Sequence, residues 1–142
     1  MVQVNAGYPH AALLVLRVAL MGMLFAFHGL DKLISLFGYL FGGQEWDFVQ
    51  FLGEQKGFPI PAVFAGAAAL GESIGALMVA VGALTRYAAG MVAATMLVVV
   101  HHHITTDMRF ELAAVYLVVA AIFLFTDPGK FSVDAWLRRK KQ

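Results

Sequence analysis

The sequence of 142 residues has no cysteine and few charged side chains. Without cysteine the chain cannot form a disulfide, supply a catalytic thiolate or hold zinc through sulfur, so a thiol oxidoreductase acting alone is excluded. Charged residues make up 13% of the chain, whereas soluble domains carry roughly a quarter. No basic stripe favours nucleic acid as a partner. These absences point to an apolar chain that water does not surround.

Apolar residues make up 61% of the sequence and come in long blocks. A helix needs about 20 such residues to cross the hydrocarbon core of a bilayer. Four blocks approach this length, and the short connectors between the last three favour antiparallel packing. We therefore predict one all-α domain over residues 1–142, a membrane-spanning antiparallel four-helix bundle. Its predicted spans are residues 11–30, 61–84, 86–104 and 109–127.

The connectors and the C-terminus predict further elements. The segment WDFVQFLGEQKGFPIP predicts a short amphipathic helix that lies on the outer surface and ends at Gly57. Aromatic rings of this kind commonly lie at headgroup level. A tight turn is predicted at Thr85-Arg86. The segment DPGKFSVDAWLRRKKQ predicts an interfacial helix whose basic residues, Arg138 to Lys141, meet anionic headgroups.

The basic C-terminus also predicts an orientation. By the positive-inside rule this end is cytoplasmic, and four spans then place both termini on that side. Arg86 falls on the same side, and the mildly acidic connector between the first two spans is periplasmic. No basic region precedes the first apolar run and no small-residue cleavage site follows it, so we expect no cleaved signal. The expected location is the cytoplasmic (inner) membrane of a bacterium or archaeon.

Two charged residues inside the predicted spans, Arg17 and Glu72, are candidates for function. A charge at mid-bilayer costs at least ~2.5 kcal/mol and must face a partner. Glu72 falls near the midplane, and Arg17 could reach toward it. Either the two form an ion pair that fixes helix register, or Glu72 carries a proton or anchors a ligand. The neighbouring Gly71 and Gly75 are expected to let another helix pack closely, and His28, on nearly the same face as Arg17, is expected to point inward.

Three adjacent histidines, His101 to His103, end the third predicted span. Successive helical residues point about 100° apart, so at least one of the three must face the bundle. Asp107 in the next connector and Glu111 at the start of the fourth span are expected nearby. Adjacent histidines do not have the HEXXH spacing that binds metal on one helix face. We expect His28, one of the three histidines and Glu111 to converge into a site.

These landmarks occur together in the DoxX family of small four-helix membrane proteins, which the sequence resembles over residues 16–137. The matching stretches are, in order, LRVALMGMLFAFHGLDKL, FVQFLGEQKGFPIP, AGAAALGESIGALMVAVGALTR, the three histidines with FELAAVYLVVAA, and DPGKFSVDAWL. The positions that match the family pattern are Arg17, His28, Gly29, Lys32, Glu72, Leu84, Thr85, Arg86, the three histidines and Glu111.

The resemblance implies an integral membrane subunit of, or associated with, a membrane oxidoreductase, because related chains form the membrane part of thiosulfate:quinone oxidoreductase. We expect the inward-facing side chains to interact with quinone. The expected catalytic residues are Glu72, His28 and Arg17. The expected quinone-binding residues are His28, Lys32, Glu72, His101, His102, His103 and Glu111. No ligand set for haem, flavin or an iron–sulfur centre is evident, so electrons have to come from a partner protein or a substrate.

Two other functions fit the same residues. One is a non-catalytic membrane anchor or assembly subunit, which would present the aromatic connector to a partner. The other is the handling of a metal or small solute by the outer histidines. In each case we expect the lipid bilayer around the chain, and either a protein partner or a homo-oligomer. Whether the chain is itself an enzyme stays open at this point.

Overall fold

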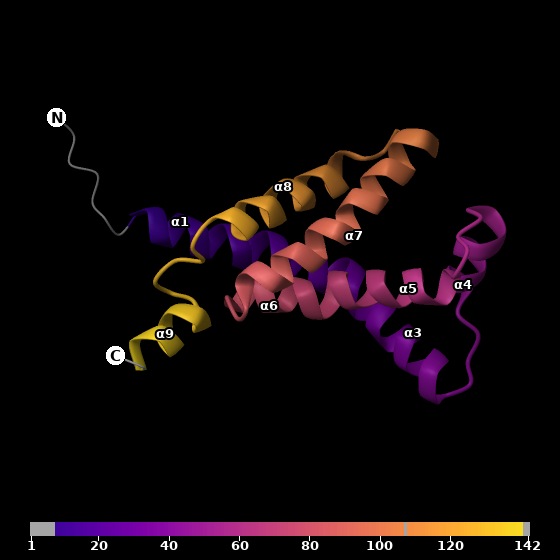
Figure 1. Ribbon diagram of the computed structural model, residues 1–142, viewed down its shortest axis with the longest axis horizontal. Coiled ribbons are helices and arrows are strands. Elements are labelled where there is room, and N and C mark those ends of the chain that lie inside the picture. The colour runs from indigo at the N-terminus through magenta and orange to yellow at the C-terminus, as the bar shows by residue number, and fades with distance from the viewer. Residues whose placement is uncertain (1–7, 107, 141–142) are drawn as a thin grey trace.

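The computed structural model describes residues 8–106 and 108–140, and every regular element in them is a helix (Figure 1). The prediction of an all-α chain is confirmed for this part. Asp107 and Lys141 lie outside the described residues, as does the N-terminal segment on which the expected lack of a cleaved signal rests.

The first helix is one continuous rod that is longer than predicted. It consists of α1 (Tyr8–Leu16), η1 (Arg17–Met21), α2 (Gly22–Leu24), η2 (Phe25–Gly29) and α3 (Leu30–Phe41), where η marks a π-helical segment. The prediction that a connector starts at Asp31 is wrong, because apolar residues continue at helical spacing as far as Phe41. The rod ends at two glycines, the second of which, Gly43, has a positive φ of 62°.

The second helix consists of α5 (Pro61–Leu70), η4 (Gly71–Gly75) and α6 (Ala76–Val81). It ends at Gly82, whose left-handed φ of 76° turns the chain toward α7 (Thr85–Thr106). The predicted turn at Thr85-Arg86 is therefore wrong in position. Residues 82–84 form the turn, and Thr85 already begins the third helix.

Three helices are long and apolar enough to cross a membrane: Pro9–Phe41, Pro61–Val81 and Thr85–Thr106. The helix α8 (Glu111–Phe125) lies alongside α7 (Figure 1) and is apolar, but it has only 15 residues. At ~1.5 Å per residue it covers about 22 Å of a hydrocarbon core that is ~30 Å thick. The described chain thus contains three candidate spans, and the complete antiparallel four-helix bundle stays a proposal.

The main core lies where η1, α2, α6, α7 and α8 meet. Its largest fully buried apolar side chains are Met21, Leu24, Val79, Val92 and Phe123. Close approach of the second helix to α7 depends on two glycines. A Cβ on Gly71 would meet the hydroxyl of Thr95 at 2.4 Å, and one on Gly75 would meet Val92 at 3.3 Å. The predicted packing role of both glycines is confirmed.

The connector forms α4 (Asp47–Gln50) and η3 (Phe51–Gln55), where a short helix is predicted. Gly57, with φ of 67°, ends it, and the Phe58 N–H donates to the Leu52 carbonyl at 3.0 Å, which confirms the predicted cap. Trp46, however, is only 7% exposed. This ring is therefore covered by the chain's own helices, onto which the segment folds, and the expected headgroup level of the segment stays a prediction. The resulting second core contains Leu36, Trp46, Leu52, Ala65 and Ala69.

The outward faces of the long helices are apolar. Phe27, Phe41 and Phe125 are each at least 70% exposed. Monomeric soluble proteins rarely expose apolar patches of this extent, so lipid is the surrounding that fits these faces. The last helix, α9 (Val133–Lys140), follows a loop that starts after α8, and it likewise leaves Trp136 and Leu137 exposed.

Candidate functional site

Glu72 lies in the middle of the second helix, within η4, and is 2% exposed. The ammonium Nζ of Lys32, on α3, donates to Glu72 Oε2 at 2.6 Å. A carboxylate inside a membrane helix needs such a partner. The expected approach of Arg17 to Glu72 is wrong, because Lys32 takes that place and Arg17 is bound elsewhere.

A cavity of about 660 Å³ lies beside this ion pair. It occupies the wedge between α5 and α7, which are close at η4 and diverge toward the α4 end of the molecule (Figure 1). Most of its wall is apolar. The lining residues that carry the argument are Lys32, Phe48, Phe51, Lys56, Phe64, Glu72, Met91, Val98, His102 and His103.

Two phenylalanine rings of the α4–η3 segment connect polar groups of this cavity. Phe48 and Phe51 are nearly parallel, with ring centroids 6.3 Å apart and an interplanar angle of 16°. The Lys32 ammonium lies 5.1 Å from the centroid of Phe48, and the Lys56 ammonium lies 5.0 Å from that of Phe51. His102 meets Phe51 edge-on at 6.3 Å. The rings therefore gather two cations and an imidazole at one rim of the cavity.

The three adjacent histidines divide between the cavity and the outside. His102 and His103 line the cavity, whereas His101 is exposed. The prediction that at least one of them faces inward is confirmed. The Nδ1 atom of His102 is also 3.3 Å from the hydroxyl of Thr106.

His28 and Glu111 do not line this cavity, and both are exposed. The imidazole of His28 instead meets the ring of Tyr116 edge-on, with centroids 6.3 Å apart. The expectation that His28 points inward on the face of Arg17 is wrong. Two π-helical segments, η1 and η2, contain these two residues, and their wider turns shift the register on which a shared face was counted.

Arg17 is 1% exposed and belongs to the opposite end of the molecule. Its Nη1 donates to the Pro128 carbonyl at 2.9 Å, and its Nη2 donates to the Phe131 carbonyl. Both acceptors lie in the loop before α9. This arginine therefore ties the first helix to the C-terminal loop, and it reaches neither Glu72 nor the large cavity.

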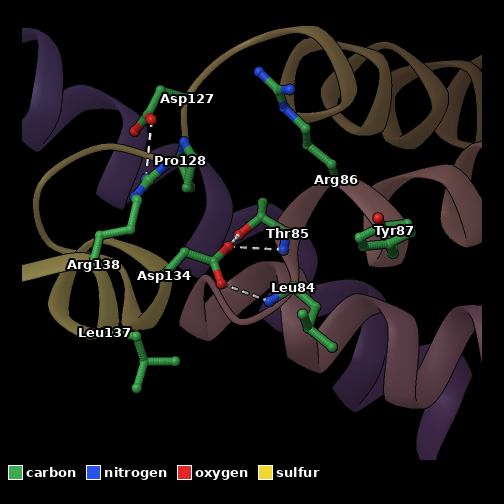
Figure 2. Close-up of a pocket in the computed structure, with 9 residues that line it drawn as sticks. All are labelled: Leu84, Thr85, Arg86, Tyr87, Asp127, Pro128, Asp134, Leu137 and Arg138. Atoms are coloured by element: carbon green, nitrogen blue, oxygen red, sulfur yellow. Dashed lines mark hydrogen bonds and ion pairs between the residues drawn. The ribbon is translucent and has the colours of Figure 1, made fainter. Parts of the chain in front are cut away.

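A second cavity, of about 390 Å³, lies near this end between the start of α7, the loop after α8 and α9 (Figure 2). Asp134 accepts hydrogen bonds from the Leu84 N–H at 2.8 Å, the Thr85 N–H at 2.9 Å and the Thr85 hydroxyl at 2.7 Å. Burial opposes ionisation of this carboxyl, but these hydrogen bonds and the nearby Arg138 outweigh it and hold the pKa of Asp134 below its ordinary value. Asp134 thus caps α7 and fixes α9 to it.

The large cavity also contains groups that sequence reasoning did not identify. Phe48, Phe51, Lys56, Phe64 and Met91 look like ordinary apolar or surface residues in the sequence, and only the divergence of α5 and α7 brings them together. The pairing of Lys32 with Glu72 could have been predicted, because apolar residues continue at helical spacing beyond Asp31 and place Lys32 on the first helix. Within the residues that the structure describes, no three His, Cys, Asp or Glu side chains are close enough to hold a metal ion.

The apolar helices and the ion pair set among them define an integral membrane protein. The sequence profile of the DoxX family matches residues 12–104, so the chain belongs to this family. A search of curated proteins and a search of solved structures each gave no match.

Proposed function

We propose that this chain binds quinone in the cavity between α5 and α7, as the quinone-binding subunit of a membrane oxidoreductase. The observation that carries the proposal is the Lys32–Glu72 ion pair, 2.6 Å long, set in the wall of a largely apolar cavity. Of the residues expected from sequence, we assign Lys32, Glu72, His102 and His103 to the site. Arg17, His28, His101 and Glu111 are not assigned to it.

The size and chemistry of the cavity fit such a ligand. Small-molecule sites commonly have volumes of roughly 300–1,000 Å³ and apolar walls with a few placed polar groups. The cavity has about 660 Å³, with Phe64, Met91 and Val98 available to hold a ring. Quinone carbonyl oxygens require hydrogen-bond donors, which the Lys32 ammonium and the two imidazoles provide.

The ion pair suits a site where protons move. A bound quinone takes up electrons and protons when it is reduced, and this chain supplies the polar groups beside it. The carboxylate of Glu72 can accept a proton, and the ammonium of Lys32 can turn from Glu72 toward a ligand oxygen. Because Lys32 is held between Glu72 and the Phe48 ring, its ammonium is placed at the cavity wall before a ligand arrives.

The remaining parts of the proposal concern the surroundings of the site. Electrons come from a soluble partner or substrate, since this chain contributes binding and proton transfer. The cluster of Arg86, Arg138, Arg139 and Lys140 at one end supports a cytoplasmic position for that end in the inner membrane. The cavity then opens near the outer face, with the α4–η3 segment between it and the periplasm.

Equilibrium binding to the purified protein in lipid nanodiscs tests the proposal. A short-tailed ubiquinone or menaquinone analogue should bind to the wild-type chain and bind at least roughly tenfold more weakly to Glu72→Gln and Lys32→Met. Glu111→Gln is the matched control, since it removes an exposed glutamate outside the cavity. Equal affinity in all four proteins would refute the assigned site.

A further inference from the structure

The ionisable groups around the large cavity include more cations than anions. Among the residues that the structure describes, its lining has two ammonium groups, Lys32 and Lys56, two imidazoles, and the single carboxylate of Glu72. Glu72 is 2.6 Å from Lys32 and so neutralises that lysine. With neutral imidazoles the lining keeps a net charge of +1, and Lys56 is the source of the excess.

Lys56 has an aromatic ring as its partner but no carboxylate among the described contacts. Its ammonium lies 5.0 Å from the centroid of Phe51, and the side chain is partly buried. A ring face attracts a cation without neutralising it. An ammonium next to a low-dielectric cavity is therefore stabilised further by an anion that enters the cavity.

The position of the excess charge is defined as well. Because Phe48 and Phe51 stack, the ammonium groups over these two rings belong to one rim, and His102 reaches the same rim through its contact with Phe51. The rest of the lining is largely apolar and includes Phe64, Met91 and Val98. A matching ligand has an acidic group at one end and an apolar body at the other.

We infer that the cavity selects an amphipathic anion, which within the quinone class means a quinone with an ionised ring hydroxyl. The inference rests on the proposed function and adds the charge of the ligand to it. The anionic oxygen lies at the rim between Lys56 and Lys32, and the ring and its alkyl chain lie between α5 and α7. Lys56 is then the specificity-determining residue, while Lys32 and Glu72 bind any quinone.

A matched ligand pair tests this inference. The probes are a 2-hydroxy-3-alkyl-1,4-naphthoquinone, at a pH where its hydroxyl is ionised, and the corresponding 2-methoxy ether, which has no charge. Each is titrated into the protein in nanodiscs of zwitterionic lipid. The hydroxyquinone should bind roughly tenfold tighter than the ether. This ratio should fall close to one in Lys56→Gln and stay unchanged in Lys56→Arg.

Lys130→Gln is the control for a lost lysine. The Lys130 ammonium also lies over a ring, 5.2 Å from the centroid of Phe131, but it does not line the large cavity. Each affinity is calculated from the concentration of the ligand in the lipid, so the different partition of the two ligands cancels from the ratio. A ratio that Lys56→Gln leaves unchanged, or equal binding of the two ligands to the wild type, overturns the inference and leaves quinone binding intact. Binding of neither ligand overturns the proposed function itself.

Discussion

Gly29 lies directly against the backbone of Glu72. A Cβ placed on Gly29 would be 2.1 Å from the Glu72 carbonyl oxygen and 2.7 Å from the Cα of Ser73. Backbone atoms cannot move aside as the end of a side chain can. The first and second helices therefore cross at the residue that carries the buried carboxylate, and the absence of a side chain at Gly29 sets their distance.

We predict that Gly29→Ala separates these helices and weakens the site. Forcing extra atoms into a packed contact costs typically ~1–3 kcal/mol, so the thermal unfolding midpoint in detergent should fall and quinone-analogue binding should weaken with it. Gly22→Ala is the control, because a Cβ there meets nothing within 4 Å. That variant should be neutral or slightly more stable, since alanine favours a helix over glycine by roughly 0.5–1 kcal/mol. Equal effects of the two variants would contradict the role of Gly29.

A second prediction concerns the Lys32–Glu72 pair, whose side chains are 27% and 3% exposed. A double-mutant cycle with Lys32→Met, Glu72→Gln and both together should give a coupling free energy of ~0.5–3 kcal/mol, measured by SDS-induced unfolding in mixed micelles. Removing one partner leaves the other without a counter-charge in an apolar wall. The stability losses of the two single variants should therefore add up to more than the loss of the double variant.

The Arg138–Asp127 pair provides the comparison for that cycle. Its side chains are 59% and 61% exposed at an N–O distance of 3.0 Å. Exposed pairs contribute little because water and salt screen them. The cycle on this pair should therefore give a coupling free energy near zero. A value as large as that of Lys32–Glu72 would show that burial does not determine the coupling free energy.

Local sequence patterns predicted much of this fold. Apolar periodicity predicted helices, Gly57 predicted the end of the connector helix, and Gly71 and Gly75 predicted close packing, because each depends on residues near in sequence. The partner of Glu72 was not predicted. A first span that ends at Leu30 leaves Lys32 in a loop, so Arg17 is the nearest cation within a predicted span.

Helix register and the divergence of two helices are the features that could not be predicted from the sequence. The π-helical segments that contain Arg17, His28 and Glu72 change the number of residues per turn, so faces counted at 3.6 residues per turn drift. The large cavity exists because α5 and α7 diverge beyond η4, and this angle follows from packing between distant segments. No local signal therefore marked Phe51 or Lys56 as cavity residues.

A third prediction follows from the lowered pKa of Asp134. A carboxyl whose folded-state pKa lies below its unfolded value stabilises the fold above the unfolded pKa, and that stability is lost as pH falls through the folded pKa. Asp134→Asn should therefore be less stable than the wild type at neutral pH, by about 1 kcal/mol as for other lost helix caps. The difference should shrink as the pH is lowered below the ordinary aspartate range. Thermal unfolding from neutral to acidic pH measures it.

Asp127→Asn is the control for that pH series, since Asp127 is exposed and its ion pair contributes little. Its unfolding midpoint should follow that of the wild type over the whole series. A stability difference for Asp134→Asn that persists unchanged at acidic pH would mean that the carboxylate charge does not stabilise the contact between α9 and α7.

The final prediction concerns orientation, and the lack of cysteine makes it simple to test. A single cysteine replaces either Glu45, in the connector before α4, or Lys140, at the end of α9, and both are exposed. Because the basic end of a membrane protein stays in the cytoplasm, a membrane-impermeant maleimide should label Glu45→Cys on intact spheroplasts. It should label Lys140→Cys only after the membrane is permeabilised. Labelling of Lys140→Cys from outside would invert the orientation and place the cavity rim, with Lys56 and His102, at the cytoplasmic face. The electron donor that the proposed function requires would then be a cytoplasmic protein or substrate.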